Sequence, residues 1–499
     1  MRQLKKIKTL GYVAACATAF VGNPMQTKAS SAEKATKPNM IILIADDISR
    51  DDMGCYGHPV IKTPNIDQLA NNGVKFTNAF LTASSCSPSR TSIILGRYPH
   101  NTGACELHSP IPKNQIPFPK LLKEAGYYTG QSGKWHFGAS AGKPTGVALE
   151  AFDRVGGGAS DGGGKSGAEM WVPYLKERPA DKPFFMWFAA HDAHRGWDNE
   201  IFLPEYKAKD VIVPPYMVDD EQTREDLVCY YNEVSRFDFY IGEVVKELKK
   251  QGVYDNTILI VMADNGRPFP RDKTRLYDSG IKTPFVIHWP KGVAKKGATS
   301  ESLVSVIDIA PTLLGVAGIE AGDSFQGRSF VKLLEAPETK FRSEVYAEHN
   351  WHDYEAFERM VRTKDFLYVE NGRPNLNQMG AQDIMTGGAG KSLRKGNKAG
   401  TLNEVQGRIF KEVQPEVELY NCAEDSLQLT NVANNAKYKQ VQKQLQKQLH
   451  RWMKKTKDSK PEHLTGDWYS REDCKPLKTK GIRGDMPGFD QKATEVKSE

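Results

Sequence analysis

The sequence has 499 residues, of which 39% are hydrophobic and 26% are charged, so a large core can form and global disorder is excluded. A mean hydropathy of −0.54 and the lack of a long apolar run exclude a polytopic membrane protein. The length predicts more than one domain. The net charge of +7 raises the question of a nucleic-acid or polyanion partner.

The positive charge lies at the two ends of the chain. Residues 1–29 contain five Lys and Arg and no acid, and residues 436–499 contain 16 Lys and Arg against 9 Asp and Glu. The chain between them is therefore net acidic. This distribution predicts no nucleic-acid partner, and it predicts that anions are bound by a few placed cations and a metal.

The first 29 residues have the pattern of an export signal. Four basic residues precede the apolar segment Leu10–Gly22, which is too short to span a bilayer, and small residues occupy the expected cleavage positions up to Ala29. We therefore expect a signal peptide over residues 1–29, a periplasmic or secreted protein and no membrane span. The residues before Cys16 also fit a lipobox, so a lipoprotein anchored at Cys16 is the minor alternative.

Unbroken apolar runs alternate with helical patterns along the chain. The runs Met40–Ala45, Phe184–Ala190 and Thr257–Ala263, with the shorter Thr283–His288, are typical of strands buried on both faces. Helices are predicted over residues 65–72, 117–125 and 225–251. The alternation favours an α/β fold with a mostly parallel sheet sandwiched by helices.

The character of the sequence changes after about residue 356. We expect a catalytic domain over residues 37–356 and a smaller α+β C-terminal subdomain over residues 357–499. The subdomain would contain a strand over 359–369, an amphipathic helix over 436–455 and a basic, irregular tail from about residue 459. The glycine-rich segments 156–167 and 387–400 are predicted to be loops.

Two of the apolar runs are each followed by a pair of residues with side-chain oxygens. Asp46 and Asp47 end the first run, and Asp264 and Asn265 end the third. Ligands bind at the carboxyl ends of strands in doubly wound sheets, and hard oxygen donors suit Ca²⁺ or, second, Mg²⁺. The cysteines have no zinc spacing, although Cys422 and Cys474 are a possible disulfide pair.

The segment from Cys86 to Arg90 reads Cys-Ser-Pro-Ser-Arg and is followed by Gly96-Arg97. This signature resembles that of the type I, formylglycine-dependent sulfatases. Three further segments match the family in order: Phe76–Phe80, Gly133–His136 and Glu418–Tyr420. The resemblance runs from Pro38 to about Trp452. It implies an alkaline-phosphatase-like fold.

The resemblance also implies a modified nucleophile. A maturation enzyme of this family converts the signature cysteine, here Cys86, to formylglycine (3-oxoalanine). One hydroxyl of the hydrated aldehyde attacks sulfur and the second releases sulfate, whereas a serine would be trapped in its sulfated form. The metal, Ca²⁺, would be held by Asp46, Asp47, Asp264, Asn265 and residue 86.

Five further residues acquire roles from the family. Lys134 would hold a sulfate oxygen and His136 would orient or deprotonate the diol, while Arg90 would anchor it. His194 matches the residue that protonates the leaving oxygen, although Ala193 stands where the family commonly has proline. Lys273 fits the family's second lysine, although Asp278 and Ser279 differ from the usual Glu-Gly.

Within the family the sequence is most similar to heparan N-sulfatase (sulfamidase) and to bacterial polysaccharide sulfatases. This likeness rests on Ser84–Arg90, His191–Arg195 and Asp264–Pro270. It places Arg195 and Arg267 near the pocket, where they could meet a uronate or a second sulfate. His108, His349 and His352 are candidates for the substrate pocket, with a plain surface role as the alternative for each.

The expected substrate is a sulfate ester of a sulfated glycan, with an algal polysaccharide such as ulvan favoured. An N-sulfatase acting on glucosamine N-sulfate of heparan-type glycans is the alternative. A phosphatase or phosphodiesterase of the same fold is less favoured because such enzymes use two metals and an unmodified Thr or Ser. A non-enzymatic glycan-binding relative would have lost part of the acid–base and lysine set, which is complete here.

Overall fold

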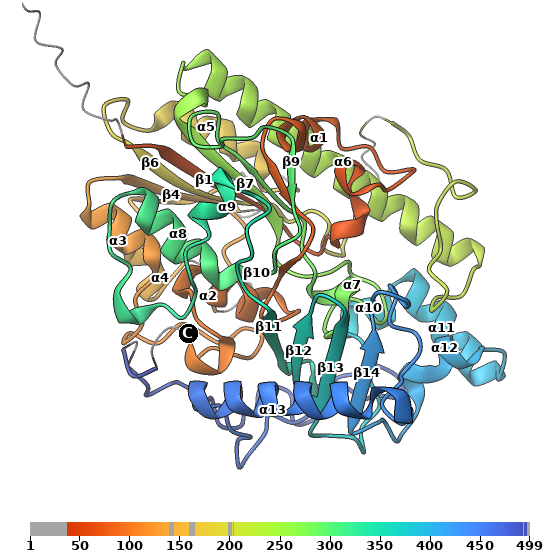
Figure 1. The fold of residues 1–499 in the computed structure, drawn as a ribbon. Helices are drawn as coiled ribbons and strands as arrows, with labels where there is room; N and C mark the ends of the chain where they lie inside the picture. The colour runs from red at the N-terminus through yellow and green to blue at the C-terminus, as the bar shows by residue number, and fades with distance from the viewer. Residues whose placement is uncertain are drawn as a thin grey trace, which may run out of the picture. The chain divides into compact units, whose positions relative to one another are not determined.

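An eight-stranded sheet lies at the centre of the computed structural model, which describes residues 37–138, 144–158, 165–197, 202, 204–492 and 494–496 (Figure 1). The expected signal segment, with Cys16, lies outside the described residues. Residues 37–499 form one compact unit. No helix in the described part of the chain is long and apolar enough to cross a bilayer.

The strands of this sheet are parallel apart from β8, which pairs antiparallel with β7 and β2. Along the sheet their order is β5 (Arg154–Gly156), β4 (Tyr128–Gly133), β6 (Phe184–Ala189), β1 (Asn39–Ala45), β7 (Thr257–Ala263), β8 (Phe285–His288), β2 (Val74–Phe76) and β9 (Ala298–Ser300). The short strands β3 (Ala79–Phe80) and β10 (Val304–Ser305) form a separate parallel pair. The predicted mixed, mostly parallel sheet is confirmed.

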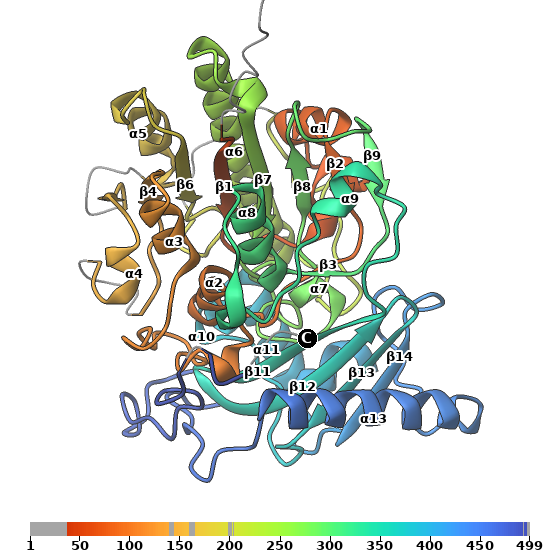
Figure 2. The same ribbon diagram turned by 60° about the vertical axis from the view of Figure 1, so that its left-hand side comes forward.

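Helices cover both faces of the sheet, because alternate residues of its central strands point to opposite sides. Ile42 and Ile44 of β1 belong to one buried core, and Ile41 and Leu43 belong to the other. The first core is closed by α2 (Cys86–Leu95), α3 (Phe118–Glu124), α4 (Val147–Glu150), α8 (Ile309–Val316) and α9 (Val331–Glu335) (Figure 2). The second is closed by α1 (Pro64–Asn71), α5 (Trp171–Glu177) and α6 (Glu221–Lys250).

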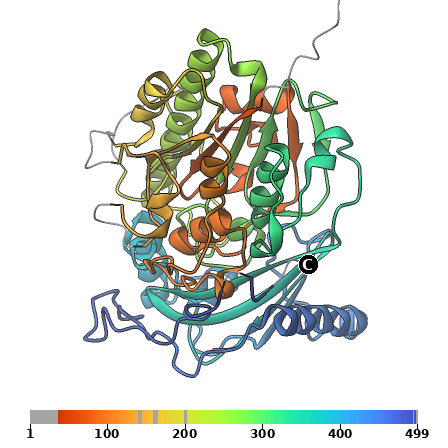
Figure 3. The ribbon, with the colours of Figure 1, turned by 90° about the vertical axis from the view of Figure 1, so that its left-hand side faces the viewer.

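A four-stranded antiparallel sheet follows, built from β11 (Glu344–His352), β12 (Tyr354–Thr363), β13 (Phe366–Asn371) and β14 (Val417–Asn421) (Figure 3). Helix α13 (Lys439–Thr456) packs on one face through Leu445, Leu449 and Trp452. The other face, including Val345 and Met360, joins the core of the large sheet. The subdomain boundary after residue 356, which falls within β12, stays a prediction.

Two local expectations are wrong. The single strand over 359–369 is a hairpin, because the chain turns at residues 364 and 365 and the Thr363 hydroxyl caps the turn at Phe366. The loop over 387–400 is largely helix α11 (Gly388–Ala399). Tertiary packing outweighs its poor helix propensity, since Ala389 donates its N–H to Asp226 of α6 over 2.8 Å.

The remaining elements are short, and the tail is irregular as predicted. The helices are α7 (Asp278–Ile281), α10 (Gln382–Thr386) and α12 (Glu404–Gly407). The six described cysteines are all free thiols, so the possible Cys422–Cys474 disulfide is not formed. The two lie in different clusters, Cys474 with α10 and Cys422 against the main core.

Candidate active site

Four neighbouring parallel strands, β4, β6, β1 and β7, deliver polar residues to one edge of the sheet. Their carboxyl ends are followed by Lys134 and His136, by His191–His194, by Asp46 and Asp47, and by Asp264 and Asn265. The sequence placed these groups at strand ends, and the sheet order makes them neighbours.

Three carboxylates and one thiol converge at this edge. Single side-chain atoms of Asp46, Asp47, Cys86 and Asp264 all lie within 4.8 Å of one another. All four side chains are buried. Cys86 is the first residue of α2, and its Sγ lies 3.4 Å from Oδ1 of Asp46 and 3.8 Å from Oδ1 of Asp47.

Each carboxylate has a cation of its own. Lys134 Nζ is hydrogen-bonded to Asp46, and Lys273 Nζ lies 2.7 Å from Oδ2 of Asp47. Arg90 Nε donates to Oδ2 of Asp264 over 2.7 Å. Buried charges need partners of this kind, because desolvation of an unpaired ion is costly. The structure therefore brings Arg90, Lys134 and Lys273 together with the three acids.

The cations change the proton affinities of the three acids unequally. Burial raises the pKa of Asp46, but Lys134, His194 and Arg90 together hold it well below its usual range. For Asp264 the effect of burial exceeds the opposite effect of Arg90 and raises the pKa to about 7. A metal cation bound at this site, in addition to Arg90, would favour the ionised form of Asp264.

Asn265 identifies where such an ion would bind. Its Nδ2 donates to Oδ1 of Asp47, while its Oδ1 is buried and has no hydrogen-bond partner among the described residues. Three carboxylates plus an unsatisfied amide oxygen are the hard donors that Ca²⁺ or Mg²⁺ takes. The donor set therefore fits the predicted cation.

The Cys86 thiol is not a ready nucleophile. Position at a helix N-terminus and nearby cations ordinarily lower a thiol pKa. Here burial, and then the charge of Asp46, raise the pKa of Cys86 well above its usual value despite Lys134 and Lys273. At neutral pH residue 86 is therefore a protonated thiol rather than a thiolate.

His136 faces a second histidine. Its Nε2 lies 2.9 Å from Nδ1 of His108, and its Nδ1 is buried with no hydrogen-bond partner in the described part of the chain. Burial and the Lys134 charge hold the pKa of His136 well below the usual value. The ring is therefore neutral, as a proton acceptor must be.

His194 lies on the open side of the site, with 35% of its side chain exposed. A ring nitrogen of His194 lies within 4.8 Å of both the Cys86 thiol and an Asp46 oxygen. Its Nδ1 is 3.0 Å from the carbonyl oxygen of Arg195, and its Nε2 is 3.7 Å from Oδ2 of Asp383. Loss of water around the ring, followed by the charges of Lys273 and Lys134, lowers the pKa of His194.

Comparison with known proteins identifies the family of the chain. A family model described as Sulfatase matches residues 38–319, more than half of the chain. The chain belongs to the sulfatase family. A second model, for the C-terminal region of N-sulphoglucosamine sulphohydrolase, matches residues 269–370. The chain is therefore an enzyme, a sulfatase of the hydrolase class.

Sequence similarity to known sulfatases extends over most of this chain. It is 30% identical to an ulvan-active sulfatase of Formosa agariphila, over 86% of this chain and 82% of that protein. It is 29% identical to human N-sulphoglucosamine sulphohydrolase, over 89% and 96% of the two chains. The solved structure of BT4656 with its substrate D-glucosamine-2-N,6-O-disulfate has the same fold, with a TM-score of 0.63, 22% identity and coverage of 85% and 99%.

Two arginines that the sequence placed near the substrate are held by acids of the protein. Arg195 makes a bidentate pair with Asp226, at 2.9 and 2.8 Å, and its Nε donates to the carbonyl of Pro268. Arg267 lies 3.2 Å from Asp52 and 3.4 Å from Asp272. Neither guanidinium is free for a sugar in this sulfatase, so their contacts favour structural roles.

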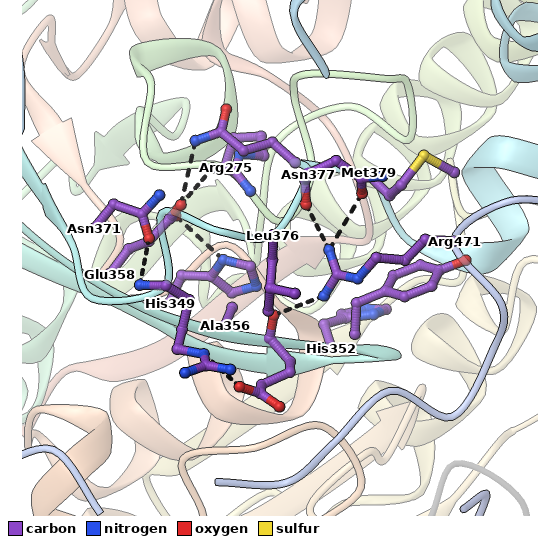
Figure 4. A pocket seen from close by; sticks show the side chains of 14 residues that line it. Arg275, His349, His352, Ala356, Glu358, Asn371, Leu376, Asn377, Met379 and Arg471 are labelled. Atoms are coloured by element: carbon purple, nitrogen blue, oxygen red, sulfur yellow. Dashed lines mark hydrogen bonds and ion pairs between the residues drawn. The ribbon is translucent and has the colours of Figure 1, made fainter. Parts of the chain in front are cut away.

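His349 and His352 line a small cavity (Figure 4), and the charge of His352 also acts on His108 and Asp383. His349 Nδ1 lies 3.3 Å from Glu358, whose other oxygen accepts from Arg275 over 2.6 Å. The cavity measures about 20 Å³, roughly the space of one water molecule. It is too small for a sugar, and His349 belongs to a buried ion-pair network.

Two contributors from the C-terminal part were not predicted from the sequence. Trp351, at the end of β11, packs against Cys86 and Leu107. Asp383 of α10 faces His194. Asp383 lies next to a glycine-rich segment predicted as a loop, and its role depends on long-range packing of α10 and α11.

Proposed function

We propose that this sulfatase hydrolyses sulfate esters of a sulfated polysaccharide, or of its oligosaccharides, at a formylglycine made from Cys86. The observation that carries the proposal is the protonated, buried thiol beside Asp46, set in a cluster of cations. A hydrated aldehyde supplies two hydroxyls on one carbon, which the thiol lacks. A formylglycine-generating maturation enzyme is therefore a required partner.

Five ligands would hold one Ca²⁺: Asp46, Asp47, Asp264, Asn265 and an oxygen of modified residue 86. The unsatisfied Oδ1 of Asn265 supports this set. When bound, the ion would polarise sulfate oxygens and the nucleophile. Mg²⁺ is the less favoured ion, because it prefers fewer protein ligands and more waters.

The chain's own residues supply the remaining chemistry. Lys134 and Lys273 hold sulfate oxygens, and Arg90 keeps residue 86 and Asp264 in place. His136 takes a proton from the nucleophile through its free Nδ1. His194 protonates the leaving oxygen from the exposed side, where bound sulfate would raise its lowered pKa.

The proposal of a polysaccharide substrate is supported by the substrates that the names of the relatives give. The ulvan-active sulfatase favours an O-sulfated algal glycan such as ulvan. The match to N-sulphoglucosamine sulphohydrolase, which extends into the C-terminal region, favours glucosamine N-sulfate as the second candidate. A panel of sulfated algal and animal glycans separates the two. Inorganic sulfate release from ulvan oligosaccharides supports the first, and release of a free amine from N-sulfoglucosamine supports the second.

The experiment needs matched controls. The protein is co-expressed with a maturation enzyme, and Cys86→Ala serves as the inactive control. An aryl phosphate tests the phosphatase alternative. If no sulfate is released from any ester or sulfamate while phosphate is released, the proposal is wrong.

We also propose export to the periplasm or the medium after cleavage of residues 1–29. The basic and apolar pattern of this segment supports it. Cell fractionation followed by N-terminal sequencing tests it, with a start at Ser30 as the expected result. Cleavage before Cys16 and lipid labelling would indicate the lipoprotein instead.

A further inference from the structure

His108 is tied to the helix that carries the nucleophile position. Its backbone N–H donates to Oγ of Ser87 over 2.7 Å, and Ser87 follows Cys86 in α2. The φ angle of His108 is 65°, in the left-handed region that few residues other than Gly and Asn adopt readily. The sequence suggested His108 as a substrate contact, but the ring turns toward another histidine.

Nδ1 of His108 and Nε2 of His136 are 2.9 Å apart, and the ring centres are 5.0 Å apart. A hydrogen bond between two neutral imidazoles requires one N–H and one lone pair. Burial lowers the pKa of both histidines, that of His108 to about 4, so both rings are neutral at pH 7. The pair therefore has two possible tautomeric arrangements.

The two arrangements leave Nδ1 of His136 in different states. If His136 donates from Nε2, its Nδ1 carries a bare lone pair. If His108 donates from Nδ1, His136 carries its proton on Nδ1. That Nδ1 is the buried atom with no partner among the described residues. An N–H at this buried atom would have no acceptor among the described residues, which favours the arrangement with the lone pair on Nδ1.

We propose that His108 is a positioning residue that keeps the proton of His136 on Nε2 and the lone pair on Nδ1. His136 is then ready to accept the proton of the nucleophilic hydroxyl at residue 86. The O–H bond breaks as the Nδ1–H bond forms, and the resulting imidazolium keeps its Nε2–H bond to His108. The inference rests on the proposed function for the identity of that hydroxyl.

The surroundings of His108 fit this role. Besides His136, the groups that act on its ring are His352, Asp353, Arg483 and Lys134. In the proposed arrangement His108 accepts at Nδ1 and carries its own proton on Nε2. The Ser87 contact fixes the backbone, so the distance between the two rings is coupled to α2.

Nitrogen NMR of the histidine-labelled protein tests the tautomer without any turnover. His136 is assigned from the spectrum of His136→Asn. A protonated-type signal for Nε2 and an unprotonated-type signal for Nδ1 are expected. The reverse assignment, or a charged ring at pH 7, would overturn the proposal. The same spectrum can be recorded for protein with unmodified Cys86. The tautomer of His136 is therefore determined independently of the proposed function.

Two variants test the same point by kinetics. In His108→Asn the side-chain oxygen takes the place of Nδ1 as acceptor, and asparagine tolerates the left-handed backbone. In His108→Leu no acceptor remains. We expect kcat to fall about 100-fold in the leucine variant and less than about tenfold in the asparagine variant, with KM little changed. The control is His450→Leu, an exposed histidine on α13.

Three kinetic results would contradict the inference. These are equal losses of kcat in the two His108 variants, wild-type kcat in His108→Leu, or a rise in KM alone, which would indicate a substrate contact. If the wild type releases no sulfate from any ester, the proposed function fails, and the NMR result still decides the tautomer. If His108→Leu does not fold, the asparagine variant and the NMR spectrum still test the proposal.

Discussion

The Sγ atom of Cys86 lies 3.4 Å from Oδ1 of Asp46, and both side chains are buried. A carboxylate at this distance disfavours the thiolate, and burial disfavours it further. The same oxygens suit a cation that a hydroxyl at residue 86 could share. The arrangement therefore makes the thiol of residue 86 a poor nucleophile, which is the reason for proposing that it is converted to formylglycine.

The variant Cys86→Ser tests whether turnover needs two hydroxyls at residue 86 or only one. Serine can accept a sulfate but has no second hydroxyl with which to expel it, so we expect turnover to fall by at least about a thousandfold. Steady-state sulfate release and the mass of the intact protein check this. Cys229→Ser, at a half-buried cysteine of α6, is the control. Full activity of the serine variant would refute the mechanism.

Calcium should stabilise the folded protein. A ligand that binds only the native state at 100 times its Kd adds about 2.7 kcal/mol to the free energy of unfolding. We expect Tm to rise with added Ca²⁺ and to fall with a chelator. The rise should disappear in Asn265→Leu, which lacks the unsatisfied Oδ1, and persist in the exposed control Asn434→Leu. An equal shift in both variants would place the ion elsewhere.

Asp383 should matter most for substrates with poor leaving groups. Its carboxylate is 3.7 Å from His194, and Lys273 and His194 outweigh burial and keep its pKa well below the usual range. A negative charge at this distance favours the protonated form of His194. In Asp383→Asn we expect kcat for a sugar sulfate to fall about tenfold, equivalent to one pKa unit.

Aryl sulfates provide the comparison, because a phenolate leaves without protonation. Their kcat should be almost unchanged in Asp383→Asn. The control is Asp219→Asn, at an exposed acid paired with Arg224. Equal losses for both substrate types would show that Asp383 supports the site in some other way.

Gly387 should be required for the position of His194. A Cβ at this residue would come within 2.1 Å of an Arg195 nitrogen, and Arg195 adjoins His194. We expect Gly387→Ala to displace Arg195 from Asp226 and to lower kcat several-fold, measured with a sugar sulfate. At Gly407 the nearest side-chain atom would be 3.9 Å away, so Gly407→Ala is the matched control. Equal activity of the two variants would contradict the coupling.

The buried Glu358–Arg275 pair should make the free energy of unfolding depend on pH in the acidic range. Burial raises the pKa of Glu358, but Arg275 outweighs it and lowers the pKa to about 2, from 4.5 in an unpaired side chain. A depressed folded pKa stabilises the protein above pH 4.5, and that stabilisation is lost as pH falls toward 2. It amounts to about 3 kcal/mol.

Glu358→Gln removes this dependence. The free energy of unfolding of the variant should lie below that of the wild type at pH 7, and the gap should narrow between pH 4.5 and 2. Denaturant unfolding at several pH values measures it. Glu301→Gln breaks an exposed pair with Lys364 and should change little. A gap that stays constant with pH would show that the pair contributes nothing through ionisation.

The sequence predicted the parts of this enzyme that depend on local pattern. Apolar runs located β1, β6 and β7, and the rule that ligands bind at their carboxyl ends located Asp46 and Asp264. The motif around Cys86 indicated the family. In contrast, the partners of Arg195 and His108 come from residues far along the chain, and no periodicity marks such contacts.

The same limit explains why the segment 387–400 was wrongly predicted to be a loop. Helix α11 forms because Asp226 binds its first turn, although its glycines disfavour a helix. The partnership of Asp383 with His194 depends on that packing. Long-range contacts of this kind decide which charged residues remain free for a substrate.

Mass spectrometry of the peptide that contains Cys86, from protein co-expressed with a maturation enzyme and assayed for sulfate release, tests the central claim most directly. The account predicts a peptide with an aldehyde in place of the thiol group, and activity in proportion to the fraction converted. A peptide that retains the thiol in a fully active preparation would contradict it.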